Sequence, residues 1–253
     1  MGARVAHMYC YLISGAANVQ TVYRNSKAQR TDTVIMEIYR TAFSLDKHDL
    51  KIYQDDTSGS SAIPWTDIPE DKRIWHALHE AQNKHVQGVE HLGVLSRVFS
   101  SSFQQTMKSA TTEEWETINL YEFFRNSFSD ASETALLGNT AFKVNPRLTE
   151  DFWIFFSGFL GFVLGAPKFM LKKCHAARTR LIDTYVRHLE NVDDRYDSIQ
   201  QANPDWDPDL GARVNRLRDK SIKDKGVSLR GRAALQMGFM IGYELLPSIV
   251  YYT

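Results

Sequence analysis

The chain has 253 residues, enough for one large domain or two small ones at about 150 residues a domain. Its 30 basic and 30 acidic side chains give a formal charge of +0, which argues against a dedicated nucleic-acid binder, because such proteins depend on a basic excess. A 43% apolar fraction with 12% aromatic residues excludes a disordered chain and can fill a sizeable core.

The sequence shows no signal peptide and no clear membrane span. Residues 152–164 are the most apolar internal stretch and fall short of the roughly 20 residues that a span needs. Residues 233–252 approach that length but carry Glu244 and Pro247, which favours a buried helix. With only two cysteines and no disulfide framework, we expect a reducing compartment and a protein that is soluble or lies on a membrane surface.

The N-terminal region predicts one short strand and then helices. Residues 5–14 are rich in Val, Tyr and Ile and end at a Ser-Gly pair, which indicates a strand. Residues 18–24 predict a short helix, and the Asp-, Ser- and Gly-rich residues 55–61 predict a loop. The remaining pattern predicts six or seven helices, so the fold class is mainly α.

Two capping boxes indicate helix starts. Asp67 with Glu70, and Asn119 with Glu122, have the spacing at which side chains satisfy the free N–H groups of a first turn. We expect the first helix to be interrupted near residue 88 by a glycine, and the second to end at residue 138 with another.

Three further helices follow. Residues 149–164 are apolar nearly all round and end at a Gly-Ala-Pro break. Residues 169–194 carry an apolar stripe of helical period, and residues 203–208 predict a turn-rich connector. Ser228 is the expected N-cap of a final helix that runs to residue 252.

Several short strings occur in an order and spacing that resemble a known family. They are residues 13–20 (ISGAANVQ), 49–53 (DLKIY), 72–75 (KRIW), 133–138 (ETALLG) and 150–153 (EDFW). Together they resemble the N-terminal half of a cytochrome P450, in the fungal branch related to prostacyclin synthase and sterol 7-alpha-hydroxylases. The resemblance implies a single partial P450 domain over 1–253, with a short N-terminal strand, helices B to I and an incomplete core. The corresponding helices would be C at 70–88, E at 119–137, F at 149–164, G at 169–194 and I at 228–252.

The resemblance implies a function. A cytochrome P450 activates O₂ at a haem iron and hydroxylates a lipophilic small molecule with electrons from an NADPH-dependent reductase, in this branch within fungal secondary metabolism. The residues 152–169 would then roof the substrate pocket and contact a membrane, so the protein would be cytoplasmic or peripheral to the endoplasmic reticulum membrane.

The haem-binding residues are incompletely matched. The family holds iron by a thiolate in an F-x-x-G-x-x-x-C-x-G loop, whereas Cys10 and Cys174 have Ala6 and Met170 at the glycine position. We therefore expect a truncated member that does not retain haem and has no turnover, with no catalytic residue and no metal ligand assigned.

One cofactor contact is matched in part. The family's W-x-x-x-R, which holds a haem propionate, corresponds to Trp75 and His79, so these are the candidate cofactor-binding residues. A histidine is less reliably charged than an arginine, and the alternative is a core tryptophan beside a solvent-facing histidine.

Other patterns favour plainer interpretations. Three E-x-x-R matches, at Glu37, Glu70 and Glu122, precede the position at which the family has its own, and we interpret them as helical surface pairs. Lys72, Arg73 and Lys84 form either a reductase-docking surface or a solvated helix face. His76, His79, His85 and His91 lack the partners of a metal site. The rival function is a non-catalytic helical protein that binds a lipophile or a partner.

Overall fold

The computed structural model describes residues 2–5, 8–11, 13–24, 32–86, 89–110 and 117–250, with side chains described within 13–24, 32–86, 92–110 and 117–241. In this part of the chain the fold is mainly α, as the sequence predicted, but it has twelve α-helices instead of the six or seven expected, with two small two-stranded sheets. The helices are α1 (Ala16–Arg24), α2 (Asp32–Thr41), α3 (Lys47–Asp55), the 3-10 helix η2 (Glu70–Lys72), α4 (Ile74–Val86), α5 (Val89–Ala110), α6 (Leu120–Leu137), α7 (Ala141–Val144), α8 (Leu148–Ser157), α9 (Phe159–Val163), α10 (Lys172–Ala202), α11 (Arg213–Asp224) and α12 (Leu229–Val250).

The prediction of one lone N-terminal strand was wrong. The strand β1 (Gly2–Val5) pairs antiparallel with β2 (Met8–Tyr11), and the Gly2↔Tyr11 register closes a hairpin. A second ribbon joins β3 (Trp206–Asp207), which lies inside the connector predicted at 203–208, to β4 (Gly211–Ala212), which follows it. In each ribbon the two strands are close in sequence and pair with one another. Each described strand therefore has the hydrogen-bonding partner that a single strand would lack.

The two capping boxes have different outcomes. Asn119 caps α6 as predicted, because its side-chain oxygen accepts the Glu122 backbone N–H at 3.2 Å. The helix start predicted at Asp67 is wrong: the chain forms η2 there, Pro69 has no side-chain cap bond, and α4 begins at Ile74. The Glu70 side chain accepts a hydrogen bond from Arg73 at 2.8 Å instead of reaching back to the backbone.

The helix predicted over 149–164 is two helices. They separate at Gly158, where a Cβ atom would lie 2.6 Å from the Cys174 sulfur, so only glycine allows α10 to approach so closely. The helix predicted over 169–194 is confirmed but runs on to Ala202, where Asn203 ends it in the left-handed conformation. Its predicted stripe is buried throughout: Ala177, Leu181, Tyr185, Leu189 and Val192.

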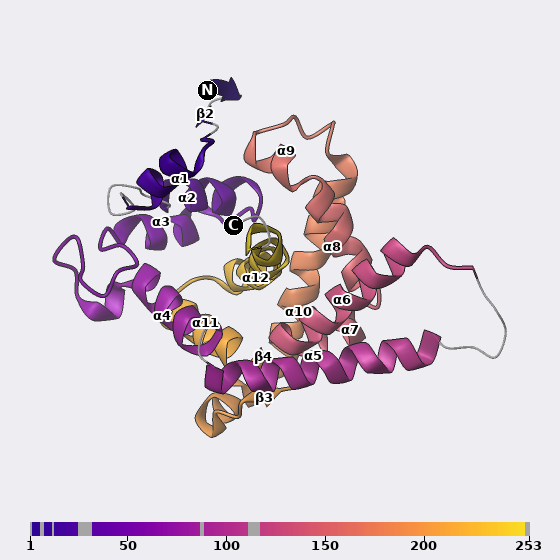
Figure 1. Ribbon diagram of the computed structural model, residues 1–253. Coiled ribbons are helices and arrows are strands. Elements are labelled where there is room, and N and C mark those ends of the chain that lie inside the picture. Colours follow the sequence, from indigo (N-terminus) through magenta and orange to yellow (C-terminus); the bar gives the residue numbers. More distant parts are fainter. Residues whose placement is uncertain are drawn as a thin grey trace.

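The final helix, α12, lies at the centre of the molecule (Figure 1). It packs against α10, which also contacts α8, while α4 packs against α11 and α5 against α6. The N-terminal helices α2 and α3 lie on the opposite side of α12 from α8 and α10 (Figure 1). The buried residues of these elements form one apolar core, which runs from Tyr39 in α2 to Ile241 in α12. No helix among the described residues is long and apolar enough to cross a bilayer.

The predicted stop of α6 is confirmed at Gly138, whose φ is 88°. A Cβ atom at this position would lie 2.5 Å from the Pro208 carbonyl oxygen, and one at Gly211 would lie 2.2 Å from the Leu136 carbonyl oxygen. The Asn139 N–H donates to the Pro208 carbonyl at 3.0 Å. The close approach of two glycine backbones therefore fixes the second ribbon against the end of α6.

Candidate functional site

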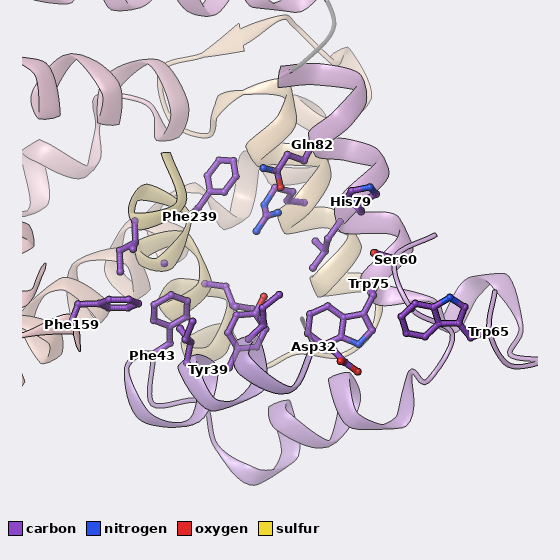
Figure 2. Close-up of a pocket in the computed structure, with 18 residues that line it drawn as sticks. Asp32, Tyr39, Phe43, Ser60, Trp65, Trp75, His79, Gln82, Phe159 and Phe239 are labelled. Carbon is purple, nitrogen blue, oxygen red and sulfur yellow. The ribbon is translucent and has the colours of Figure 1, made fainter. Parts of the chain in front are cut away.

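A cavity of about 490 Å³ lies between α2, α4, α9, α11, α12 and the loop over 56–69. Aromatic side chains dominate its wall, and Figure 2 shows them around the open space: Tyr39, Phe43, Trp65, Trp75, Phe159 and Phe239. The polar groups of the wall are fewer: Asp32, Ser60, His79, Gln82 and Arg218. A concave, mainly apolar wall with a few polar groups is typical of a small-molecule site.

The first predicted site residue, Trp75, is buried in the first turn of α4 and lines this cavity. Its backbone N–H donates to the Asp56 carboxylate at 2.9 Å, and its indole N–H donates to the Tyr53 carbonyl at 3.1 Å. Its ring stacks on Tyr39 with centroids 6.1 Å apart. The indole nitrogen is thus already paired within the protein, and Trp75 presents its ring to the cavity.

The second predicted site residue, His79, lies one turn further along α4 and is exposed at the wall of the same cavity (Figure 2). Its Nε2 atom lies 2.8 Å from the Asn83 side-chain nitrogen. A spacing of four residues places Trp75 and His79 on one helix face, so the structure brings the two candidates together. Their role toward a cofactor stays a prediction.

A buried polar network supports the loop over 56–69. The Arg73 side chain is 2% exposed and donates to Ser58 Oγ at 3.1 Å and to the Ala62 carbonyl at 3.3 Å. Ser58 Oγ in turn donates to the Asp56 carboxylate at 2.6 Å. The interpretation of Arg73 as a surface cation is therefore wrong, because its guanidinium holds the loop that carries Trp65.

Arg218 is a wall residue that sequence reasoning missed. It lies on α11, and its guanidinium carbon is 4.4 Å from the centroid of the Phe239 ring. Burial raises the pKa of the Tyr39 hydroxyl, and the positive charge of Arg218 offsets part of this rise. No motif marks Arg218 in the sequence, since it reaches the cavity only through the packing of α11 against α4.

The described wall does not fit a haem-thiolate centre. Cys174 lies on α10 and packs against the end of α8, with its sulfur 3.8 Å from Ser157 Oγ, and does not line the cavity. Cys10 lies in β2, and its side chain is outside the described residues. Among the described side chains of the cavity wall there is no sulfur that could ligate iron from within it.

The remaining sequence candidates divide among several environments. The Glu37–Arg40 and Glu70–Arg73 pairs are formed, at 3.0 and 2.8 Å, whereas Arg125 lies over the Tyr121 and Trp153 rings. His85 is buried in α4, and the side chain of His91 lies outside the described residues. The acidic residues at 113–116 also lie outside them.

The region predicted to roof the pocket contains α8 and α9. Phe152, Phe155 and Phe162 are buried in the core, whereas Leu160 and Phe169 are 67% and 71% exposed. Phe159 from α9 lines the cavity (Figure 2). Residues 152–169 therefore contribute some side chains to the core and present other apolar side chains at the surface.

Comparison with known proteins gives a distant similarity to fungal cytochrome P450 monooxygenases. The chain is 23% identical over 236 residues to the monooxygenase calL of Penicillium decumbens, which covers 92% of this chain and 44% of that protein. It is 25% identical over 197 residues to fsoE of Humicola fuscoatra, covering 72% of this chain and 33% of that protein. A shorter match of 66 residues to poxD of Penicillium oxalicum reaches 36% identity.

The similarity to calL and fsoE covers most of this chain, whereas the chain spans only a third to just under half the length of these two relatives. No family model matches the chain, and no solved structure matches it. The resemblance noted in the sequence is thus supported at the level of distant similarity to fungal cytochrome P450 monooxygenases.

Proposed function

We propose that this chain is part of a cytochrome P450-type monooxygenase that hydroxylates a lipophilic small molecule in fungal secondary metabolism. The similarity to fungal monooxygenases over 92% of the chain supports the family. The aromatic cavity supports the substrate class, because burying an apolar molecule against such a wall is favourable by about 25 cal/mol per Å².

The chain supplies the pocket in this proposal, not the iron ligand. A bound haem provides O₂ activation in cytochromes P450, and the described wall holds no sulfur for its iron. We expect the 253-residue chain by itself not to hold haem. For Trp75 and His79 the proposal is limited to a contact with a haem propionate, which rests on the family resemblance.

Two further contacts belong to the same proposal. Lys72 and Lys84 are exposed near and on α4 and would face an NADPH-dependent reductase. The exposed Leu160 and Phe169, with Met170, would contact the endoplasmic reticulum membrane. Apolar surface of this kind commonly marks an interaction site.

A second candidate is a non-catalytic lipophile-binding protein. It is favoured by one observation: the described residues of this chain line a mainly aromatic cavity of about 490 Å³. In this case the 253 residues would bind a lipophile and carry out no oxidation.

Binding is tested by titrating the purified chain with a neutral terpenoid while following tryptophan fluorescence, since Trp65 and Trp75 line the cavity. We expect saturable quenching that Trp65→Phe reduces, whereas Trp206→Phe, remote from the cavity, leaves it unchanged. Absence of saturable quenching would contradict both candidates.

Catalysis is tested separately by adding haem, reductase and NADPH to the chain and measuring oxidised terpenoid. We expect neither product nor the absorption band of reduced, carbon monoxide-treated cytochromes P450. If that band appears and Cys174→Ser or Cys10→Ser abolishes it, the expectation that this chain does not hold haem is wrong.

A further inference from the structure

We infer that the cavity selects lipophiles that carry a carboxylate, which Arg218, Tyr53 and Gln236 bind in a recess at its inner wall. The inference rests on the proposed function insofar as it requires the cavity to bind a lipophile. It adds the chemical class of that ligand.

The recess adjoins the cavity and shares four wall residues with it: Leu78, Arg218, Leu235 and Phe239. It adds Tyr53 and Gln236, and its volume of about 10 Å³ holds roughly one water-sized group. A ligand whose terminal carboxylate lies beside Arg218, which borders both spaces, can therefore place one carboxylate oxygen in the recess while the other oxygen stays in the cavity.

Three groups that can donate hydrogen bonds border this recess: the Tyr53 hydroxyl, the Gln236 side-chain amide and the Arg218 guanidinium. The Tyr53 hydroxyl and the Gln236 side-chain nitrogen are both buried, and neither has a hydrogen-bond partner among the described residues. Arg218 stacks on Phe239 but makes no ion pair with any described carboxylate. Buried donors without partners are rare, because each costs about 1–3 kcal/mol.

The nearby acidic residues do not neutralise Arg218. Asp219, which also borders the recess, receives both hydrogen bonds from Arg232, at 3.0 and 2.6 Å. Asp32 lines the main cavity but does not border the recess. The guanidinium therefore remains a half-buried positive charge in a mainly apolar wall, an arrangement that an anionic ligand group stabilises.

A carboxylate fits these donors better than a hydroxyl does. An ionised carboxylate accepts about four hydrogen bonds and donates none, whereas a hydroxyl oxygen accepts about two. Stacking on a ring leaves the edge of a guanidinium available for bidentate bonds. Burial raises the pKa of the Tyr53 hydroxyl well above its usual value, so this group keeps its proton and can donate it.

The ligand class follows from the two compartments. The aromatic cavity of about 490 Å³ takes the apolar body, and the recess takes one oxygen of the charged head group. We therefore expect a lipophilic monocarboxylic acid, such as a long-chain fatty acid or a terpenoid acid.

The test compares a long-chain fatty acid with the alcohol of equal chain length, each displacing a hydrophobic fluorescent dye from the 253-residue chain at neutral pH. We expect the acid to bind about tenfold or more tightly, as charged hydrogen bonds provide. Arg218→Gln should remove most of this preference and leave the affinity for the alcohol within about twofold. The matched control is Arg187→Gln, which changes an exposed arginine on α10 and should alter neither affinity.

A second variant keeps the test decisive if Arg218→Gln does not fold, which circular dichroism will show. Tyr53→Phe removes only the hydroxyl and should weaken the acid about threefold to tenfold without weakening the alcohol. Equal affinity of the wild-type chain for acid and alcohol overturns the carboxylate inference while the lipophile cavity stands. Failure of both ligands to bind overturns the cavity itself.

Discussion

Asp49 in α3 binds the first turn of α12 across 179 positions of sequence. Its carboxylate accepts the Ser228 backbone N–H at 2.8 Å and the Ser228 hydroxyl at 2.6 Å, and Ser228 Oγ accepts the Gly231 N–H at 3.0 Å. The predicted cap at Ser228 is thereby confirmed. A buried negative charge at the positive end of the central helix joins the N-terminal helices to the rest of the core.

The first prediction concerns this link. Asp49→Ala should lower the free energy of unfolding by about 2–4 kcal/mol, because it removes a buried acceptor of two hydrogen bonds. The measurement is urea denaturation followed by circular dichroism. Asp55→Ala, which breaks only the exposed Lys51–Asp55 pair, should cost less than about 1 kcal/mol. Equal losses in the two variants would contradict a structural role for Asp49.

The second prediction concerns the approach of α12 to the cavity wall. A Cβ atom at Gly238 would lie 2.1 Å from the Phe43 ring, so Gly238→Ala should destabilise the protein by about 1–3 kcal/mol and weaken lipophile binding. Gly93→Ala is the control, since its nearest atom, on Arg97, is 3.8 Å away and the site is helical. That change should stabilise by about 0.5–1 kcal/mol. A stabilising Gly238→Ala would refute the contact.

The third prediction concerns pH. His188 is buried in α10, and burial lowers its pKa below the ordinary 6.5, partly offset by a hydrogen bond that the ring donates to the Asp209 backbone carbonyl and by the Asp209 charge. Below pH 6.5 His188 becomes protonated in the unfolded chain, whereas in the folded chain it stays neutral until the pH reaches its lowered pKa. The free energy of unfolding therefore falls as the pH falls. The loss is at most about 1.4 kcal/mol per pH unit until the folded pKa is reached.

The measurement compares urea midpoints above and below pH 6.5 for the wild type and His188→Gln. The variant should lose this part of the pH dependence. The exposed Lys172 provides the comparison, and Lys172→Gln should keep the wild-type slope. An unchanged slope in His188→Gln would show that His188 does not carry the effect.

The fourth prediction concerns the loop that closes the cavity. Arg73→Met should cost about 2–3 kcal/mol and weaken terpenoid binding, because Ser58 and the loop carbonyls lose a buried donor. The neighbouring Lys72→Met changes an exposed side chain and should affect neither quantity. Both are measured by denaturation and by tryptophan quenching. The same response in the two variants would mean that the Arg73 network does not support the pocket.

Local spacing in the sequence was enough to predict α6, α10 and α12, the caps at Asn119 and Ser228, and the buried stripe of α10. These features depend on hydrogen bonds and apolar periodicity within a few residues, so no knowledge of the fold is needed. The family resemblance, and not local periodicity, selected Trp75 and His79 as candidates, and both line the cavity. The family resemblance came from the order of short strings along the chain.

The remaining features depend on contacts between distant segments. Gly158 divides a helix because Cys174 approaches it, and Arg73 is buried because the loop over 56–69 folds onto it. The donors of the recess come from α3, α11 and α12, and no spacing in the chain relates Tyr53 to Arg218. Burial and charge pairing are properties of the packed core, and for that reason the recess became visible only when the helices were assembled around α12.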